Sequence, residues 1–439
     1  MRSARAGPKR PTPRARPANP LHARSGRARV PAIASRMRVI HLITRLIVGG
    51  AQENTVASVL GLRRKPGLEV TLVAGLTTGP EGSLESLVAS ESGLLTRLPA
   101  LVRPVHPWLD WRAVRELTAL FRKRRPDIVH THSGKAGILG RLAARRAGVP
   151  TIIHTIHGPS FGPFQGPLAN WAFCSAERYA GRFTTHFVVV ANAMADQYLA
   201  AGIGRPSQYT RILSGFDLEP YLAAKPDPAW RARLGLAPDD IVVGKVARLF
   251  KLKGHDDLIA AAPDLVQTCR RFKFLLVGDG LWRPTFEDRV RRLGVADHFV
   301  FAGLVPPAEV PRYIGIMDVL VHLSRREGLP RALPQALAAG KPVIAFDCDG
   351  AREVCLDRET GFLLAPGDRV GLRDRLLLLA RDAALRGRLG GRGQALVRDA
   401  FSVDRMVDQL HDLYTRLAGT PGFDRAGEHQ AASRHPARL

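Results

Sequence analysis

The chain has 439 residues, of which 45% are apolar and 24% charged, and its formal net charge is +26. This length and apolar content suffice for two or three packed domains. No apolar run approaches the roughly 20 residues of a membrane-spanning helix, and the start lacks the apolar core of a signal peptide. Four scattered cysteines exclude a disulfide framework, so we expect a reduced, cytoplasmic protein.

The basic charge is concentrated at the start of the chain. Residues 1–36 contain ten Arg or Lys and no acid, and they show no hydrophobic period. Such a composition predicts a disordered basic tail, and a start codon assigned upstream of the true start, Met37, would explain it equally well. An arm that binds single-stranded nucleic acid uses aromatic residues beside its cations. This segment has none, so we expect no nucleic-acid partner. The polar residues 419–439 are also expected to be disordered.

From Met37 onward, short apolar runs alternate with helix-forming segments. The predicted strands cover residues 37–44, 68–74, 127–133, 151–155, 186–191, 241–247, 274–280, 298–303, 318–323, 343–346 and 359–364. The predicted helices cover residues 51–62, 111–123, 135–148, 255–265, 332–339, 370–383 and 403–417. This alternation predicts an α/β fold with parallel sheets.

The most informative turn of the second series holds an acidic residue. Glu327 lies in a Gly/Pro turn between an apolar run and a helical segment that Gly340 ends. In parallel sheets, ligands bind at the carboxyl ends of the strands, beside helix N-termini that suit anions. A carboxylate at a helix start also serves as a capping residue, and for Glu327 alone both interpretations stay open.

Several segments resemble one known family. EGLP at 327–330 and QALAAGKPV at 335–343 are similar to the E-x7-E segment of the retaining family-four glycosyltransferases of GT-B fold. Similar loops are GGAQEN at 49–54, HTHSGKAG at 130–137, HTIHG at 154–158 and the R-x4-K pair at 248–253. One position departs, because the family's second glutamate is Gln335 here. Its amide can hydrogen-bond but carries no charge.

The resemblance implies a GT-B fold of two Rossmann-like domains that face each other across a cleft. Residues 37–219 would bind the acceptor, residues 220–400 would bind the nucleotide sugar, and a helix at 401–418 would pack back on the first domain. The implied reaction is retaining transfer of a hexosyl or N-acetylhexosaminyl group from a UDP- or GDP-sugar, in cell-envelope or exopolysaccharide synthesis. The catalytic residues implied are His157 and Glu327, both on the donor sugar. The implied nucleotide-binding residues are Gly49, Gly50, Arg248, Lys253, Gly328, Leu329, Arg331, Ala332 and Gln335.

The residue types also indicate how charge would be neutralised. Two cations in one turn, Arg248 and Lys253, suit a diphosphate. The chain has no Asp-x-Asp motif or carboxylate cluster of the kind that holds Mg²⁺. His130, His132 and His157 lack the spacing of a metal site, so we expect no metal cofactor and expect His132 and His157 to line the cleft. We find no obvious carboxylate nucleophile in the first domain, which agrees with the family's front-face mechanism.

Two other function classes stay open. A sugar-nucleotide epimerase could share this architecture, although the Phe- and Pro-rich segment at 159–173 favours a protein with an acceptor loop. A basic nucleic-acid-binding protein is supported only by the net charge.

The acceptor and the place of action are the last inference from the sequence. Basic residues gather at 122–125 and 141–146, and Phe164 and Trp171 lie in the loop and helix after the 151–155 strand. Together they predict an enzyme that docks on the inner face of the plasma membrane, on anionic lipid, to glycosylate a lipid-linked or glycan acceptor. Arginines on solvated helix faces, and ordinary packing on the sheet of the helix that follows the loop within 158–181, explain these residues equally well.

Overall fold

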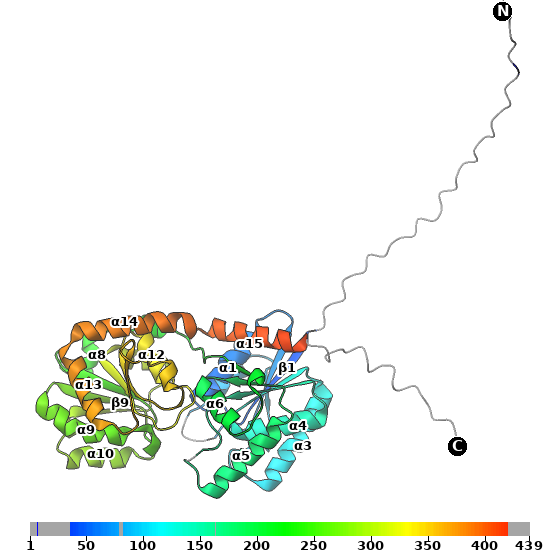
Figure 1. Ribbon diagram of the computed structural model, residues 1–439, viewed down its shortest axis with the longest axis horizontal. Coiled ribbons are helices and arrows are strands. Elements are labelled where there is room, and N and C mark those ends of the chain that lie inside the picture. Colours follow the sequence, from blue (N-terminus) through cyan, green and yellow to red (C-terminus); the bar gives the residue numbers. More distant parts are fainter. Residues whose placement is uncertain (1–6, 8–35, 79–81, 163, 420–439) are drawn as a thin grey trace, which may run out of the picture. The chain divides into compact units, whose positions relative to one another are not determined.

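The computed structural model describes residues 7, 36–78, 82–162 and 164–419. Apart from Gly7, Arg36 and Gly419, the two predicted tails lie outside the described residues. The remainder is built around two parallel sheets, one after the other along the chain (Figure 1).

The first sheet has the strand order β3-β2-β1-β4-β5-β6-β7. Its strands are β1 (Met37–Ile43), β2 (Leu68–Ala74), β3 (Leu95–Arg97), β4 (Ile128–His132), β5 (Thr151–Ile156), β6 (His186–Val189) and β7 (Tyr209–Arg211). The helices between them are α1 (Gly50–Arg63), α2 (Glu85–Ala89), α3 (Pro107–Arg124), α4 (Gly134–Ala147), α5 (Pro167–Gly181) and α6 (Asn192–Ala200). We call this part the first domain.

The second sheet has the order β10-β9-β8-β11-β12-β13. Its strands are β8 (Ile241–Val246), β9 (Phe272–Val277), β10 (Phe299–Gly303), β11 (Val319–His322), β12 (Val343–Phe346) and β13 (Gly361–Leu364). The helices that follow β7, up to the end of the described chain, are α7 (Glu219–Leu222), α8 (Pro228–Arg233), α9 (His255–Thr268), α10 (Arg283–Arg292), α11 (Val310–Gly315), α12 (Ala332–Ala338), α13 (Arg369–Arg381), α14 (Ala383–Ala400) and α15 (Val403–Ala418). We call the part around this sheet the second domain.

Both sheets reverse their strand order beside their first strand. β1 lies between β2 and β4, and β8 lies between β9 and β11. At such a reversal the following loops diverge to opposite faces and leave a crevice at the carboxyl ends of the strands. The predicted α/β class with two Rossmann-like sheets is thus confirmed, and the predicted domain boundary at 219–220 falls between the last strand of one sheet and the first of the other.

The sequence prediction missed α14, and its packing explains why. The helix contains four glycines, a composition that disfavours an isolated helix. A Cβ atom at Gly390 would lie 1.9 Å from the carbonyl oxygen of Gly340, and one at Gly393 would lie 2.3 Å from Leu337. The glycines therefore let α14 lie close against α12, so a tertiary contact outweighs the local propensity.

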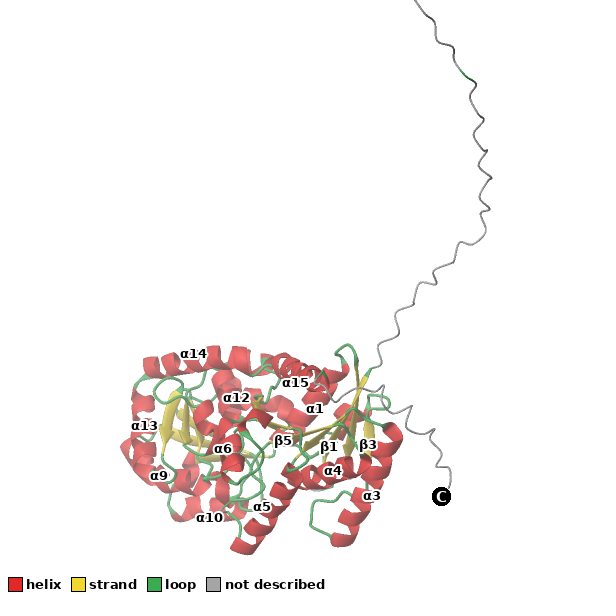
Figure 2. Ribbon diagram, turned by 45° about the vertical axis from the view of Figure 1, so that its right-hand side comes forward, coloured by secondary structure: helices red, strands yellow, loops and turns green. Residues whose placement is uncertain are grey.

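The last helix completes the core of the first domain. Met406, Val407, Leu410, Leu413 and Tyr414 of α15 are buried in one cluster with residues of β1 and α1. α15 lies along α1 in both views (Figures 1 and 2). The end of the chain is therefore part of the domain in which the chain began.

A buried ion pair joins α4 to α5. The side chains of Arg141 and Glu177 are both fully buried, with Nη2 of Arg141 2.5 Å from Oε2 of Glu177. The guanidinium also donates from Nε to the carbonyl oxygen of Gly137 at 2.8 Å. The expectation that Arg141 belongs to an exposed basic patch is therefore wrong. Burying a cation is tolerable only beside a carboxylate, and Glu177 supplies it.

We expect Glu177→Gln to lower the free energy of unfolding by about 3–5 kcal/mol, because it leaves a buried guanidinium uncompensated. Denaturant titration measures this. Glu116→Gln is the matched control, since its carboxylate pairs with Arg112 on the exposed face of α3 and should cost less than about 0.5 kcal/mol. Equal effects of the two substitutions would contradict a stabilising role for the buried pair.

Candidate active site

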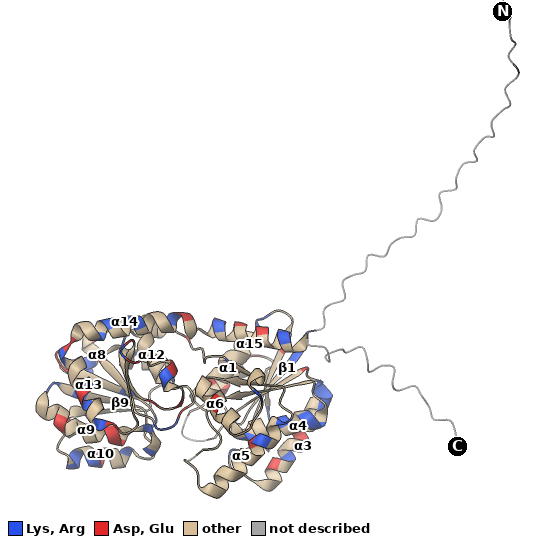
Figure 3. Cartoon of the chain, in the orientation of Figure 1, with Lys and Arg blue, Asp and Glu red and all other residues tan. Residues whose placement is uncertain are grey.

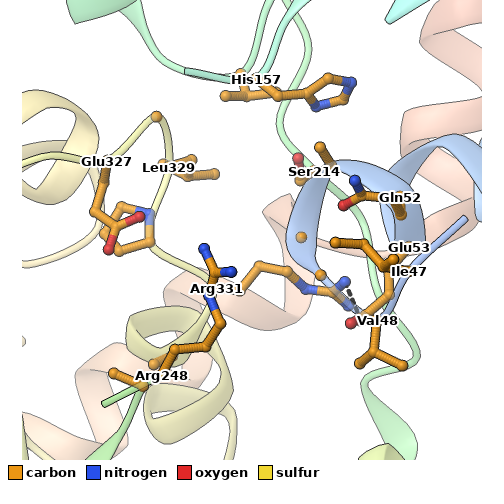
Figure 4. Close-up of a pocket in the computed structure, with 18 of the residues that line it drawn as sticks. Ile47, Val48, Gln52, Glu53, His157, Ser214, Arg248, Glu327, Leu329 and Arg331 are labelled. Atoms are coloured by element: carbon orange, nitrogen blue, oxygen red, sulfur yellow. Dashed lines mark hydrogen bonds and ion pairs between the residues drawn. The ribbon is translucent and has the colours of Figure 1, made fainter. Parts of the chain in front are cut away.

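A cavity of about 700 Å³ is lined by loops that follow strands of both sheets. These loops follow β1, β4 and β5 of the first sheet and β8, β10 and β11 of the second. Figure 4 shows Gln52 and Glu53 on one side of the cavity and Arg248 and Glu327 on the other. All eleven site residues named from the sequence lie on this wall: Gly49, Gly50, His157, Arg248, Lys253, Glu327, Gly328, Leu329, Arg331, Ala332 and Gln335.

The two domains come into backbone contact at Gly328. A Cβ atom at this position would lie 1.8 Å from the carbonyl oxygen of His157, which is the first residue after β5. On its other side, the amide of Gly350 donates to the carbonyl oxygen of Gly328 at 3.0 Å. Only glycine fits here, because any side chain would push the loop away from the first domain.

Glu327 is held as a carboxylate by its neighbours. It forms an ion pair with Lys253, and its Oε1 lies 3.4 Å from Nε2 of His322. Burial alone would raise the pKa of this carboxyl, but the Lys253 ammonium and His322 outweigh it and hold the pKa well below its usual range. Its backbone amide donates to the Asp349 carboxylate at 2.7 Å, which fixes the turn that carries it.

A buried cation behind this cluster was missed from the sequence. Lys245 of β8 is 1% exposed, and within the described part of the chain its Nζ has no hydrogen-bond partner. Burial, followed by repulsion from Lys253, lowers the pKa of Lys245 to about 7. A lysine within the otherwise apolar run of β8 was the available signal.

The described wall carries more positive than negative side chains. The basic ones are Arg45, Arg103, Lys135, Arg248, Lys253 and Arg331, and the acidic ones are Glu53 and Glu327. Arg248 is exposed, its guanidinium lies 5.0 Å from the centre of the Phe250 ring, and it forms no ion pair with any described residue. The excess of cations suits an anionic ligand such as a diphosphate.

Besides Lys253, two predicted nucleotide-binding residues already have protein partners. Arg331 reaches across the cavity to form an ion pair with Glu53 of α1 (Figure 4). Gln335 donates from Nε2 to the hydroxyl of Tyr221 at 2.8 Å. Glu53 and Tyr221 were not among the sequence-predicted residues, although both line the cavity. Glu53 is a carboxylate of the first domain, but it is bound to a cation.

Of the two histidines expected to line the cleft, only His157 does so. His132 is 1% exposed and lies behind it, with its Nδ1 3.0 Å from Nε2 of His157. As the last residue of β4, it points into the packed interior of the domain. His41, His130 and His132 bring ring nitrogens within 4.8 Å of one another. Each of these six nitrogens has a hydrogen-bond partner, so the cluster is satisfied by protein groups alone.

Among the described residues, no helix has the length and apolar content needed to cross a bilayer.

Two family models together match most of the chain. Residues 49–215 match the glycosyl transferase 4-like domain, and residues 226–395 match glycosyl transferases group 1. The first match begins after β1 and covers the other strands of the first sheet, and the second match covers all the strands of the second sheet.

The curated relatives that the chain resembles include two named glycosyltransferases. The chain is 28% identical over 343 residues to the UDP-Gal:α-D-GlcNAc-diphosphoundecaprenol α-1,3-galactosyltransferase of Escherichia coli, with 75% of this chain and 88% of that protein covered. It is 30% identical over 336 residues to the GDP-mannose-dependent α-(1-6)-phosphatidylinositol monomannoside mannosyltransferase of Mycobacterium tuberculosis, with 72% and 82% covered. The epimerase alternative finds no support in these matches.

Solved structures agree on the fold. The Anabaena protein HepE, determined in complex with UDP-glucose, superposes with a TM-score of 0.73 at 23% identity and covers 87% of this chain and 100% of its own. The sucrose-phosphate synthase of Thermosynechococcus elongatus gives a TM-score of 0.70 at 20% identity, with 87% and 99% covered. The chain therefore belongs to the GT-B glycosyltransferases, enzymes that take their sugar from a nucleotide-sugar donor.

Proposed function

We propose that this enzyme transfers a hexosyl or N-acetylhexosaminyl group from a UDP- or GDP-sugar to a lipid-linked acceptor, with retention of configuration. The observation that carries the proposal is the cavity itself. The cavity lies where the strand order of each sheet reverses. Arg248, Lys253 and Glu327 line one side of it, and Gly49 and Gly50 at the start of α1 line the other.

The donor diphosphate is assigned to Arg248, Lys253 and the start of α1. Arg248 projects from the loop after β8 without an ion pair to any residue of the described ranges, so its guanidinium is available to phosphate oxygens. Gly49 and Gly50 open a helix of 14 residues, whose first N–H groups attract an anion. These groups would stabilise the negative charge that develops on the leaving diphosphate, a role that needs no metal ion.

The carboxylates of the described wall bear on the route by which configuration would be retained. Both of them, Glu53 and Glu327, are paired with cations, which favours a direct displacement over a covalent sugar intermediate. We infer that the acceptor hydroxyl attacks on the face that the diphosphate leaves. The bond from the anomeric carbon to the phosphate oxygen breaks, the bond to the acceptor oxygen forms, and the acceptor proton passes to that phosphate oxygen.

The acceptor proposal rests on the relatives and on an exposed aromatic surface. The two relatives described above are named for acceptors attached to a lipid, diphosphoundecaprenol in one and phosphatidylinositol in the other. This supports a role in assembling cell-envelope or extracellular polysaccharide. In this chain, Trp108 and Trp111 at the start of α3 are 63% and 46% exposed, and Trp171 of α5 is 66% exposed.

Trp108 and Trp111 of this surface follow a segment that reaches the cavity. The segment before α3 includes Arg103, which is part of the cavity wall, and the carbonyl oxygen of Pro104 accepts a hydrogen bond from Lys135. Aromatic rings with an adjacent cation, such as Arg115 4.7 Å from the Trp111 ring, suit the interface of an anionic membrane. An acceptor carried in that membrane would reach the cavity from this edge.

The basic cluster named from the sequence does not coincide with the aromatic surface. Basic residues recur along α3 and α4 (Figure 3), but Arg122, Lys123 and Arg125 stand at the C-terminal end of α3. Because α3 has 18 residues, its C-terminal end lies about 27 Å from its start, where Trp108 and Trp111 are. Phe164 is also excluded from the docking surface, because it is half-buried beneath the guanidinium of Arg326. The docking surface proposed is therefore Trp108, Trp111 and Trp171.

Nucleotide binding tests the donor site. Arg248→Ala and Lys253→Ala should each weaken UDP or GDP binding by about ten- to a hundredfold, because each removes charge-assisted hydrogen bonds. Isothermal titration calorimetry measures the affinity. Lys251→Ala is the matched control, since Lys251 belongs to the same turn but points toward the Trp282 ring, outside the cavity wall. Unchanged affinity in both cavity variants would remove these residues from the donor site.

Glu327 should behave differently from the cations. Glu327→Gln should lower turnover at least tenfold, because a charged ligand of the sugar is lost from the transition state. It should not weaken nucleotide binding, since it frees Lys253 from its ion pair. Steady-state kinetics on a panel of UDP- and GDP-sugars, with nucleotide titration beside it, measures both effects. Parallel losses of turnover and nucleotide affinity would contradict the role given to Glu327.

Membrane docking is tested on the full chain, so that residues 1–36 contribute equally to all variants. Replacing Trp108, Trp111 and Trp171 by Ser should reduce co-sedimentation with anionic vesicles at least tenfold, because burying one large apolar side chain stabilises binding by about 1.5–3 kcal/mol. Leu281→Ser is the control, an 82% exposed residue of the second domain. Equal binding by both proteins would argue against this surface and favour an acceptor free in solution.

A further inference from the structure

A continuous line of hydrogen bonds runs from the cavity into the core of the first domain. His157 contacts His132 at 3.0 Å, His132 contacts His41 at 2.9 Å, and His41 contacts the hydroxyl of Tyr414 at 3.1 Å. The Tyr414 hydroxyl then contacts His130 at 2.5 Å, and His130 contacts the hydroxyl of Thr155 at 2.6 Å. We call these six residues the histidine line.

The rings of the line are arranged to use both of their nitrogens. The His41 and His132 rings lie with planes 15° apart, and the His132 and His157 rings lie 27° apart. Ring nitrogens point outward in the plane of the ring, so these nearly parallel rings can meet edge to edge. All members except His157 are fully buried, and only His157 has an edge on the cavity wall.

Every imidazole in the line is neutral at physiological pH. Burial lowers the pKa of His41 and His157 to about 3, and it lowers the pKa of His130 and His132 well below the ordinary value. A neutral imidazole has one N–H donor and one bare nitrogen acceptor. Each contact needs one donor and one acceptor, so the ring protons of His157, His132 and His41 all point toward the cavity or all point away from it, and the Tyr414 hydroxyl fits either order because it can donate to His41 or accept from it.

We propose that Tyr414 is a positioning residue for the transfer reaction, because its hydroxyl anchors the histidine line and so holds His157 in one tautomer. The role of His157 on the donor sugar rests on the function proposed above. Tyr414 sits at the middle of the line, between His41 and His130, and among the described residues no other hydroxyl group hydrogen-bonds to both of these rings. In sequence it is 257 residues from His157, and it reaches this place only because α15 packs on the first domain.

This assignment gives α15 a chemical role besides its packing. With the line intact, the nitrogen of His157 on the cavity edge is fixed as a donor or as an acceptor before the sugar arrives, as electrostatic preorganisation requires. Without the Tyr414 hydroxyl, the three rings nearest the cavity lose their anchor, and both tautomers of His157 become accessible.

The tautomer of His157 is the direct test, and it needs no substrate. In full-length protein labelled with ¹⁵N-histidine, two-bond ¹H–¹⁵N spectra distinguish protonated from bare ring nitrogens, and His157→Ala identifies the signals of His157. We expect a single tautomer in the natural protein and averaged signals in Tyr414→Phe. Tyr209→Phe is the matched control, since it removes a hydroxyl that bonds the carbonyl oxygen of Ile203 at 2.7 Å, away from the line. A mixture of tautomers in the natural protein, or unchanged His157 signals in Tyr414→Phe, would overturn the proposal.

Thr155→Val covers the case in which Tyr414→Phe fails to fold, because it breaks the last contact of the line with a side chain of similar shape. It should shift the His157 signals as well, and unchanged signals would count against the line.

Turnover provides the second readout. With UDP- and GDP-sugars as donors, Tyr414→Phe should lower kcat about three- to tenfold without changing the affinity for UDP or GDP. In a His157→Ala background it should cause no further loss, since it acts through that residue. An equal loss in both backgrounds would make Tyr414 merely structural. If no donor is turned over at all, the proposed function fails, but the tautomer measurement still decides the proposal.

Discussion

The contact between Gly328 and the carbonyl oxygen of His157 is the constraint on which the site depends. It brings the turn after β11 of the second sheet against the turn after β5 of the first. Glu327 precedes this contact in the chain and Leu329 follows it, so both are held on the cavity wall. A parallel sheet offers ligand-binding loops at one edge only, and a cavity lined from two sheets requires both edges to meet.

Both acidic side chains of the described cavity wall are paired with a nearby cation. Lys253 neutralises Glu327 within the second domain, and Arg331 neutralises Glu53 across the gap between the domains. A nucleotide diphosphate would compete for Lys253 and Arg331, because both already face an anion. Ligand binding would therefore be coupled to the contacts that hold the two walls together, since the Arg331 pair has one member on each side. Arg248, without such a pair to any described residue, would bind a diphosphate without exchanging partners.

The path of the chain links its end to the chemistry at its beginning. α14 lies against α12, which carries Gln335, and α15 then lies against α1, which opens with the glycine pair. Through Tyr414, α15 also joins the buried histidines behind His157. The successive helices α14 and α15 thus pack against α12 and α1, which carry residues of the two cavity walls. A substitution in α15 can therefore alter the site without touching a substrate.

The sequence by itself determined the two parallel sheets, because alternating apolar runs and helical segments are local patterns, and it determined the loops that carry Arg248, Lys253 and Glu327, because each follows a strand. It could not predict α14, whose glycines are disfavoured until α12 lies beside them. It could not separate His132 from His157, since one ends a strand and the other directly follows one, and only packing decides which reaches the cavity. The contacts of Glu53, Tyr221 and Tyr414 could not be predicted from the sequence either. Glu53 and Tyr221 meet their site residues, and Tyr414 meets His41, across more than a hundred positions of sequence, and such contacts exist only once the tertiary structure has formed.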